Sequence, residues 1–375
     1  MSELSYLEKL LDGIEIEWKT LGDLAENLDS KRKPITSGLR DKGNIPYYGA
    51  SGIVDYVKNY IFDGDFLLVS EDGANLLARN TPIAFSISGR TWVNNHAHVL
   101  KFDTYTERKY VEYYLNNIDL TPYISGVAQP KLNKRNLDSI IIPNPSSKIK
   151  EGVVRILDKF TALTAELTAE LDMRKKQYKY YQFECLRFTE VTQYLKIGKC
   201  CDIKKGLTPI KKATPGKYPL VATTEERQSS SGYQFDCAAV CVPLISSRGH
   251  GVATIDRIYF QDGKFALGNI LCAIIPNDSR VLSAKFLRHY LFDKKDVLLV
   301  PLMRGGANVS LTVDSLKKVE IPIPPLAEQQ RIVRVLDKFD ELVKSLSREI
   351  ELRQKQYEYY RDLLFSFPKP ESVNN

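Results

Sequence analysis

The 375-residue chain lacks the motifs that mark common catalytic sites. No G-x-x-x-x-G-K-[ST] phosphate loop occurs, because the Gly-Lys pairs that begin at 198, 216 and 263 are followed by Cys, Tyr and Phe. H-E-x-x-H and G-x-S-x-G are missing too, and "NPSS" (144–147) does not match the [DNS]-P-P-[YF] motif of adenine methyltransferases. We therefore predict a protein that recognises or organises other molecules and has no catalytic residue and no cofactor of its own.

Metal ligands in a recognisable spacing are also scarce. The chain has four His, and its six Cys include no C-x-x-C pair. His96 and His98 alternate along one expected strand without a third ligand, so we expect packing and no metal. The cysteines are interpreted as reduced, small apolar residues of a cytoplasmic protein. They are Cys185, Cys200, Cys201, Cys237, Cys241 and Cys272.

No apolar run reaches the 18 residues of a membrane helix, and the longest, "CAAVCVPLI" (237–245), reads as a buried strand. The first residues, MSELSYLEKLLDG, carry acids where a signal peptide has its basic region, so we expect a cytoplasmic protein with no membrane association. A hydrophobic fraction of 43% indicates a folded chain, and a net charge of +7 is compatible with a polyanionic partner.

The chain contains a long internal repeat. "VRILDKF" (154–160) returns as "VRVLDKF" (333–339), 179 positions later, and 16 of the 35 residues from Val154 to Phe188 are identical to their partners. Upstream the similarity is weaker, as between "GVAQPKLN" (126–133) and "GGANVSLT" (305–312). A variable segment followed by a preserved one has therefore been duplicated.

The preserved segments are predicted to be long helices. Their apolar positions recur at spacings of three and four, with one stutter, and a proline cluster precedes each segment. We expect the two helices to bury their apolar faces against each other as an antiparallel coiled coil with pseudo-two-fold symmetry. The predicted seam consists of Phe160, Leu163, Leu167, Leu171, Phe339, Leu342, Leu346 and Ile350.

Each preserved segment ends in a tyrosine cluster, "QYKYYQ" (177–182) and "QYEYYR" (356–361). Tyrosines at i, i+2 and i+3 cannot all face one seam, and outward tyrosines suit protein interfaces. Docking of a partner protein and ordinary helix packing with exposed hydroxyls both fit the pattern. The candidates for partner binding are Tyr178, Tyr180, Tyr181, Tyr357, Tyr359 and Tyr360.

The variable segments alternate strand-like runs, turn signals and one short helical pattern each, which predicts mixed α/β globules and an α+β fold for the chain. Expected boundaries are a helical segment at 1–12 that packs on the helix pair, globules at 13–149 and 190–327, long helices at 150–189 and 328–370, and a tail at 371–375.

Basic residues gather in the expected loops of both globules, often beside Gly or Ser. Arg and Lys in such loops reach phosphates and guanine edges, although a solvated surface is the alternative for any one of them. The candidates for DNA contact are Lys31, Arg32, Lys33, Arg79, Arg90, Lys131, Lys134, Arg135, Lys204, Lys205, Lys211, Lys212, Arg248, His250 and Arg304.

Several phrases carry a family resemblance: "IPYYGASGI" (45–53), "VSEDGA" (69–74) against "ISSRGHG" (245–251), "IPIPPLAEQQRIVRVLDKF" (321–339) and "RQKQYEYYR" (353–361). With the duplicated plan, the chain resembles the specificity (S) subunits of type I restriction–modification systems, most closely the compact mycoplasmal members. The first copy of the most specific phrase, "NPSSKIKEGVV" (144–154), departs from "PPLAEQQRIV" (324–333), which leaves open whether both helices begin with the same contacts.

The resemblance implies two target-recognition domains that read the halves of a bipartite, asymmetric site in double-stranded DNA. It further implies that the two helices set the spacing of these domains and recruit two copies of an adenine-N6 methyltransferase subunit, with restriction subunits as further partners. Two rival readings are a stand-alone coiled-coil DNA-binding regulator and a protein scaffold with no DNA role.

Overall fold

The computed structural model describes residues 16–126, 129–188, 192–224, 228–248, 252–306 and 308–368. The expected segment at 1–12, the tail at 371–375 and the candidate His250 lie outside these residues. The chain divides into two compact units, one made of residues up to Leu167 together with those from Glu349 onward, and one spanning Thr168–Arg348.

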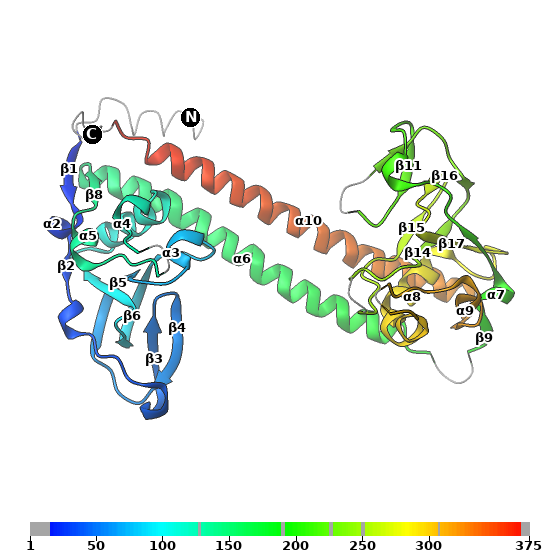
Figure 1. Ribbon diagram of the computed structural model, residues 1–375, viewed down its shortest axis with the longest axis horizontal. Coiled ribbons are helices and arrows are strands. Elements are labelled where there is room, and N and C mark those ends of the chain that lie inside the picture. The colour runs from blue at the N-terminus through cyan, green and yellow to red at the C-terminus, as the bar shows by residue number, and fades with distance from the viewer. Residues whose placement is uncertain are drawn as a thin grey trace. The chain divides into compact units, whose positions relative to one another are not determined.

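The first unit is built around a six-stranded mixed sheet (Figure 1). The central strand β5 (Phe62–Ser70) ends in a continuous buried run, because both faces of the sheet are covered. Leu67 and Val69 face one apolar cluster, whereas Phe66 and Leu68 face the other. In spatial order the strands are β2 (Glu26–Asn27), β7 (Ala97–Lys101), β5, β6 (Ala84–Val93), β3 (Lys42–Gly49) and β4 (Gly52–Val57).

One face of this sheet is covered by α4 (Tyr105–Asn117), which begins at the N-cap Thr104. An antiparallel pair, β1 (Glu17–Thr20) and β8 (Ile141–Asn144), leads into the first long helix. The short elements of the unit are α2 (Leu21–Leu24), η1 (Asp29–Lys31), η2 (Ser37–Leu39), α3 (Asn75–Ala78), η3 (Thr121–Tyr123) and α5 (Lys134–Asp138).

The second unit has two four-stranded sheets. The first has the order β10 (Cys201–Lys205), β17 (Leu271–Pro276), β14 (Ala239–Pro243) and β15 (Tyr259–Gln261). The second has the order β12 (Gln228–Ser230), β11 (Tyr218–Val221), β16 (Lys264–Leu267) and β13 (Phe235–Asp236). The remaining elements are β9 (Tyr194–Lys196), α7 (Ile197–Cys200), η4 (Ile210–Lys212), α8 (Ala284–Leu298), η5 (Val300–Leu302), α9 (Val313–Lys317) and β18 (Glu320–Pro322).

The two globules share a common plan. Each has an antiparallel strand pair before its long helix, β1–β8 and β18–β9, and one parallel pair, β3–β6 and β11–β16. The N-caps of α4 and α8, Thr104 and Ser283, lie 179 residues apart, as in the sequence repeat. The α+β class with two mixed globules, each followed by a long helix, is confirmed.

The long helices, α6 (Ser147–Cys185) and α10 (Leu326–Leu364), have 39 residues each, about 58 Å at 1.5 Å per residue. In the first unit the ring of Phe160 stacks on Tyr360, with centroids 5.4 Å apart, and meets Tyr357 edge-on at 6.5 Å. The early part of α6 thus packs on the late part of α10, which confirms the antiparallel pairing.

The second unit repeats this contact with the roles of the helices exchanged. Phe339 of α10 stacks on Tyr178 and Tyr181 of α6, with centroids 6.1 and 5.1 Å apart. Among the other predicted seam residues, Leu171 is buried and Leu163 is 36% exposed. The half-buried members are Leu167, Leu342, Leu346 and Ile350.

The repeated Asp of the "LDKF" phrase anchors each long helix to its globule. Asp158 of α6 accepts hydrogen bonds from the hydroxyls of Tyr105 and Tyr113 on α4, at 2.8 and 2.6 Å. In the second unit Asp337 accepts one from Lys285 Nζ at 2.9 Å and lies 2.7 Å from His289 Nε2, both on α8. An aspartate at the same position of the repeat therefore joins each long helix to its globule, although the side chains that it contacts differ.

We predict that Asp158→Ala destabilises the first unit by about 1–3 kcal/mol, because the buried hydroxyl of Tyr113 loses its charged partner at 2.6 Å and keeps a long contact of 3.4 Å with Thr161 Oγ1. Urea unfolding followed by tryptophan emission checks this, since both tryptophans of the chain, Trp18 and Trp92, lie in the first unit. Glu166→Ala, at an exposed position of the same helix and within the first unit, serves as the control and should change stability by less than about 0.5 kcal/mol. Equal losses in the two variants would contradict the anchoring role.

Candidate nucleic-acid interface

A loop of the same construction closes one end of each globule. In the first, Ser125 and Lys131 exchange two backbone hydrogen bonds of 2.8 Å. In the second, Arg304 and Ser310 do the same at the same distances, 179 residues later. Each loop also bridges to the segment that follows a central strand, through Asp72 after β5 and Ile245 after β14.

Both loops depend on a glycine at the same place. Gly126 has φ 81° and Gly305 has φ 133°, values that side chains rarely adopt. A Cβ would lie 2.6 Å from the carbonyl oxygen of Gln129 in the first loop and 2.2 Å from that of Asn308 in the second. The weak sequence similarity between these segments thus reflects a shared backbone.

In the first globule a buried ion network ties this loop to the basic segment at 29–34. Glu71, directly after β5, accepts a hydrogen bond from Arg32 at 2.6 Å and pairs with Lys131 Nζ at 3.1 Å. Two cations predicted separately, from segments about 100 residues apart, therefore meet on one carboxylate.

A second carboxylate, Asp29, extends the network. It lies 2.5 Å from Nδ1 of the fully buried His98, accepts a hydrogen bond from the Val99 N–H at 3.0 Å, and pairs with Arg32 at 3.3 Å. The other ring nitrogen of His98 lies 2.7 Å from the carbonyl oxygen of Leu132.

These contacts decide the ionisation of both acids. Burial by itself raises the pKa of Asp29, but His98, the Val99 N–H and Arg32 outweigh it, so the pKa lies below its ordinary value. Burial also opposes ionisation of Glu71, and Arg32, His98 and Lys131 lower its pKa in the same way. Both carboxylates of the network are therefore ionised at neutral pH.

Ligand atoms of Asp29, Glu71 and His98 lie within 4.8 Å of one another, close enough to hold a metal ion. Arg32 and Lys131 already balance the two carboxylates, however, and both nitrogens of His98 have partners. The donor set therefore suits an ion network and gives no support for a metal. His96 is exposed and pairs with Asp72 at 2.8 Å.

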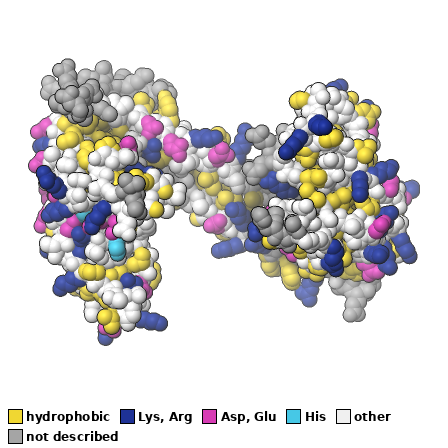
Figure 2. Space-filling model, in the orientation of Figure 1, with side chains coloured by type: hydrophobic (Ala, Val, Ile, Leu, Met, Phe, Trp, Pro, Cys, Tyr) yellow, Lys and Arg dark blue, Asp and Glu magenta, His cyan; other side chains and the backbone are white. Residues whose placement is uncertain are grey.

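In the second globule, basic residues lie near the matching loop. Lys205 ends β10, Arg304 closes the loop itself, and Arg248 is exposed after β14. Figure 2 shows Lys and Arg side chains as separate patches on the visible face of this globule. Further exposed candidates are Lys211 and Lys212 of η4 in this globule, and Lys31, Lys33, Lys134 and Arg135 in the first.

Four of the exposed or partly buried candidates bond to other groups of the protein, and one is Arg304, whose guanidinium donates to the carbonyls of Pro301 and Met303. The Arg79 guanidinium donates to the carbonyls of Leu115, Asn116 and Ile118 and so caps the end of α4, and its burial lowers its pKa. Arg90 pairs with Asp63 at 3.3 Å, at the start of β5, and therefore lies at the opposite end of the strand from Glu71. Lys204 pairs with Asp202 at 3.1 Å.

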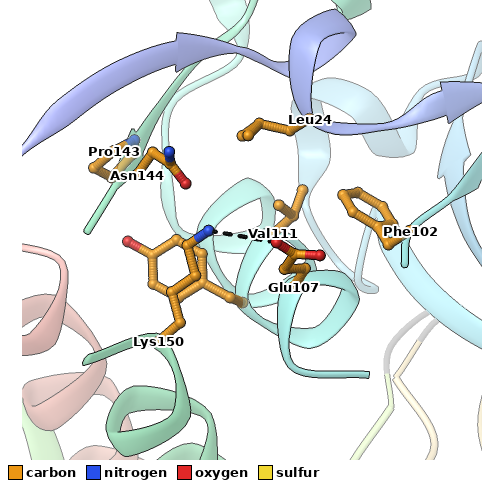
Figure 3. Close-up of a pocket in the computed structure, with 8 residues that line it drawn as sticks. Leu24, Phe102, Glu107, Val111, Pro143, Asn144 and Lys150 are labelled. Atoms are coloured by element: carbon orange, nitrogen blue, oxygen red, sulfur yellow. Dashed lines mark ion pairs between the residues drawn. The ribbon is translucent and has the colours of Figure 1, made fainter. Parts of the chain in front are cut away.

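The contacts of the two helix starts differ, which answers a question left by the sequence. Lys150, at the start of α6, is buried and points toward Glu107 of α4, with Nζ 3.9 Å from the carboxylate (Figure 3). Burial lowers its pKa, which Glu107 partly offsets. Its repeat partner Gln329 instead accepts from the Ser283 N–H and donates to the Val281 and Pro324 carbonyls, all at 2.8 Å.

The pocket beside Lys150 has a cavity volume of about 10 Å³, room for one water at most. Leu24, Phe102 and Val111 also line it (Figure 3). It therefore cannot hold a nucleotide or a cofactor, and its residues join α4 to α6.

Two globules of one plan, each with a loop end that carries basic side chains and each joined to a paired long helix, define a duplicated recognition protein. Residues 14–173 and 190–352 both match the family of type I restriction modification DNA specificity domains. The chain is 37% identical to a putative type I restriction enzyme specificity subunit of Haemophilus influenzae over 97% of this chain and 98% of that one. It is 34% identical to the specificity subunit of the type I restriction enzyme EcoR124I/EcoR124II of Escherichia coli, over the full length of both.

The solved S subunit of a Mycoplasma genitalium type I restriction–modification system has the same fold, with a TM-score of 0.70 over 96% of this chain and 98% of that one at 12% identity. The chain therefore belongs to the type I DNA specificity family, and its resemblance to type I specificity subunits is confirmed. None of the helices in the described residues is long and apolar enough to cross a membrane.

The ion network predicts acid sensitivity of the first unit. The depressed pKa values of Asp29 and Glu71 mean that the carboxylates stabilise the fold above their ordinary values of 3.8 and 4.5, and that this stabilisation is lost as pH falls through the lower folded values. Urea midpoints read from tryptophan emission should therefore fall below about pH 4.5. Glu71→Gln should flatten this dependence, and an unchanged pH profile would contradict the network.

Proposed function

We propose that the two globules read the two halves of a bipartite, asymmetric target in double-stranded DNA. The observation that carries this proposal is the loop end built twice on one backbone plan, with basic residues that differ between the copies. A shared backbone suits a shared task, and different side chains suit different DNA words. The boundaries 13–149 and 190–327 define the proposed target-recognition domains.

The two long helices set the spacing of these domains and recruit two copies of an adenine-N6 methyltransferase subunit, and restriction subunits join the complex. The chain itself catalyses no reaction and works in the cytoplasm. The support is an exposed stripe that recurs in both copies, at Lys176 and Tyr180 on α6 and at Lys355 and Tyr359 on α10. Positions four apart share a helix face, and Tyr180 and Tyr359 keep more than half of their surface exposed although their rings meet Tyr181 and Tyr360 edge-on.

The tyrosine clusters divide between packing and exposure. Tyr178, Tyr181, Tyr357 and Tyr360 contact the seam phenylalanines, although Tyr181 keeps 43% of its surface exposed. Tyr180 and Tyr359 point outward, with 61% and 57% exposed. Of the six candidates, these two offer the largest free surface to a partner.

A methylation map tests the function. The chain is expressed with the adenine methylase of its host, modified adenines are sequenced, and the methylase alone is the control. We expect a split, asymmetric motif that appears only with both proteins. Replacing residues 13–149 by those of a relative should change one half of the motif and so assign it to the first globule. A soluble complex that yields no motif would favour a scaffold, and tight specific binding by the chain alone would favour a stand-alone regulator.

The stripes predict the stoichiometry of the complex. Tyr180→Ala or Tyr359→Ala should weaken one of two methylase sites by about 30-fold in Kd, corresponding to about 2 kcal/mol at an interface hot spot. Native mass spectrometry should then show one bound methylase at concentrations where the unmodified chain holds two. Phe183→Ala is the matched control, because Phe183 is 57% exposed on α6 but has Asp362 as its repeat partner. The stripes have no role in docking if Phe183→Ala weakens binding as much.

A further inference from the structure

Glu71 joins three loops at the recognition end of the first globule. Its side chain binds Arg32, from the segment after η1, and Lys131, from the closing loop. Its backbone N–H donates to the carbonyl of His96 at 2.9 Å, and its carbonyl accepts from the N–H of Leu132 at 2.8 Å. Its side chain is 11% exposed, and that of Arg32 is 13% exposed, so this contact is shielded from water.

We propose that Glu71 is a positioning residue for DNA reading by the first globule, which it performs by holding the two cation-bearing loops in one arrangement. The inference rests on the proposed function and adds to it. One carboxylate sets where Arg32 and Lys131 lie, and it cancels charge that would otherwise attract any phosphate. The neighbouring exposed lysines, Lys31 and Lys33, are then presented to DNA from a fixed loop.

The second globule shows that the fold does not require this carboxylate. The Leu311 N–H donates to the carbonyl of Leu244 at 2.7 Å, the contact that Leu132 and Glu71 make in the first globule. The backbone loop is the same, but a buried leucine replaces the acid, and Ser310 replaces Lys131 at the closing position. The ionic clamp is therefore a property of one reader, as expected of residues that tune what that reader recognises.

The position of the basic segment has a second, independent support. The indole N–H of Trp92 donates to the carbonyl of Lys33 at 2.6 Å, so this segment is bonded to β6 as well as to Glu71. Arg32 also donates to the Ala97 carbonyl at 2.8 Å. Loss of the Glu71 charge should loosen the ion pairs, while these hydrogen bonds to backbone carbonyls keep the loop folded.

The variant Glu71→Gln tests the proposal in the complex of the full chain with its methylase. It keeps the size of the side chain and its acceptor oxygen but removes the negative charge. We expect methylation of sites with one mismatch in the first half of the motif to rise about tenfold relative to the perfect site, with the second half unchanged. Affinity for a duplex of unrelated sequence should rise and depend more steeply on salt, by about one phosphate contact.

Two variants separate positioning from simple destabilisation. Asp158→Ala weakens the same unit at a distance from the loops and should leave both half-sites intact. Glu71→Asp retains the charge and should recover most of the discrimination. Relaxation of both halves, or a motif left intact by Glu71→Gln, would overturn the proposal. If the unmodified chain directs no split motif at all, the proposed function itself has failed, and this outcome is distinct from the others.

Discussion

The rest of the structure depends on the packing of two long helices, each of which must bury an aromatic face against the other. Most of the stability of a helix in a protein comes from packing of its apolar stripe, and the packing partner of each 39-residue helix comes from the other copy of the repeat. Phe160 against Tyr357 and Tyr360, and Phe339 against Tyr178 and Tyr181, are one contact made twice. Each compact unit therefore contains the start of one helix and the end of the other, so neither half of the sequence completes a unit by itself.

The same constraint explains where the sequence has been kept and where it has changed. Phe160 and Phe339 must match their partners on the facing helix, and Asp158 and Asp337 must contact α4 and α8. The residues that contact these aspartates differ: they are two tyrosines in one copy and a lysine and a histidine in the other. The helix positions are thus fixed by contacts that leave the rest of each globule free to differ.

Much of this architecture could be predicted from the sequence, because periodicity and repetition report directly on long helices and duplicated plans. The seam phenylalanines, the helix starts after the proline clusters and the α+β globules were all predicted from patterns of this kind. The tyrosines could not be sorted, since helical spacing gives the face of a residue but not the position of the neighbouring helix. Tyr180 is outward and Tyr178 packed only because Phe339 lies where it does.

The candidate DNA residues were less predictable for a physical reason. A basic residue in a loop is recognisable from sequence, but whether its charge is free depends on acids far away in the chain. Arg32 and Lys131 are balanced by Glu71, whereas Arg79 is turned inward to cap α4. Glu71 itself carried no signal beyond the phrase "VSEDGA", because an acid after a strand is common and its two partners lie 39 and 60 residues away.

The two globules differ in whether charged or neutral side chains hold their basic segments. The first globule restrains its basic loop with buried ion pairs, whose strength depends on geometry and on exclusion of water. The second holds its basic segment with neutral contacts, as where Gln234 accepts from the Leu207 N–H at 2.9 Å and donates to the Lys205 carbonyl at 2.8 Å. Ion pairs respond to pH and to a nearby phosphate, whereas amide contacts respond to neither. Two domains of one backbone plan therefore hold their basic segments by different means, and the difference lies in a few side chains.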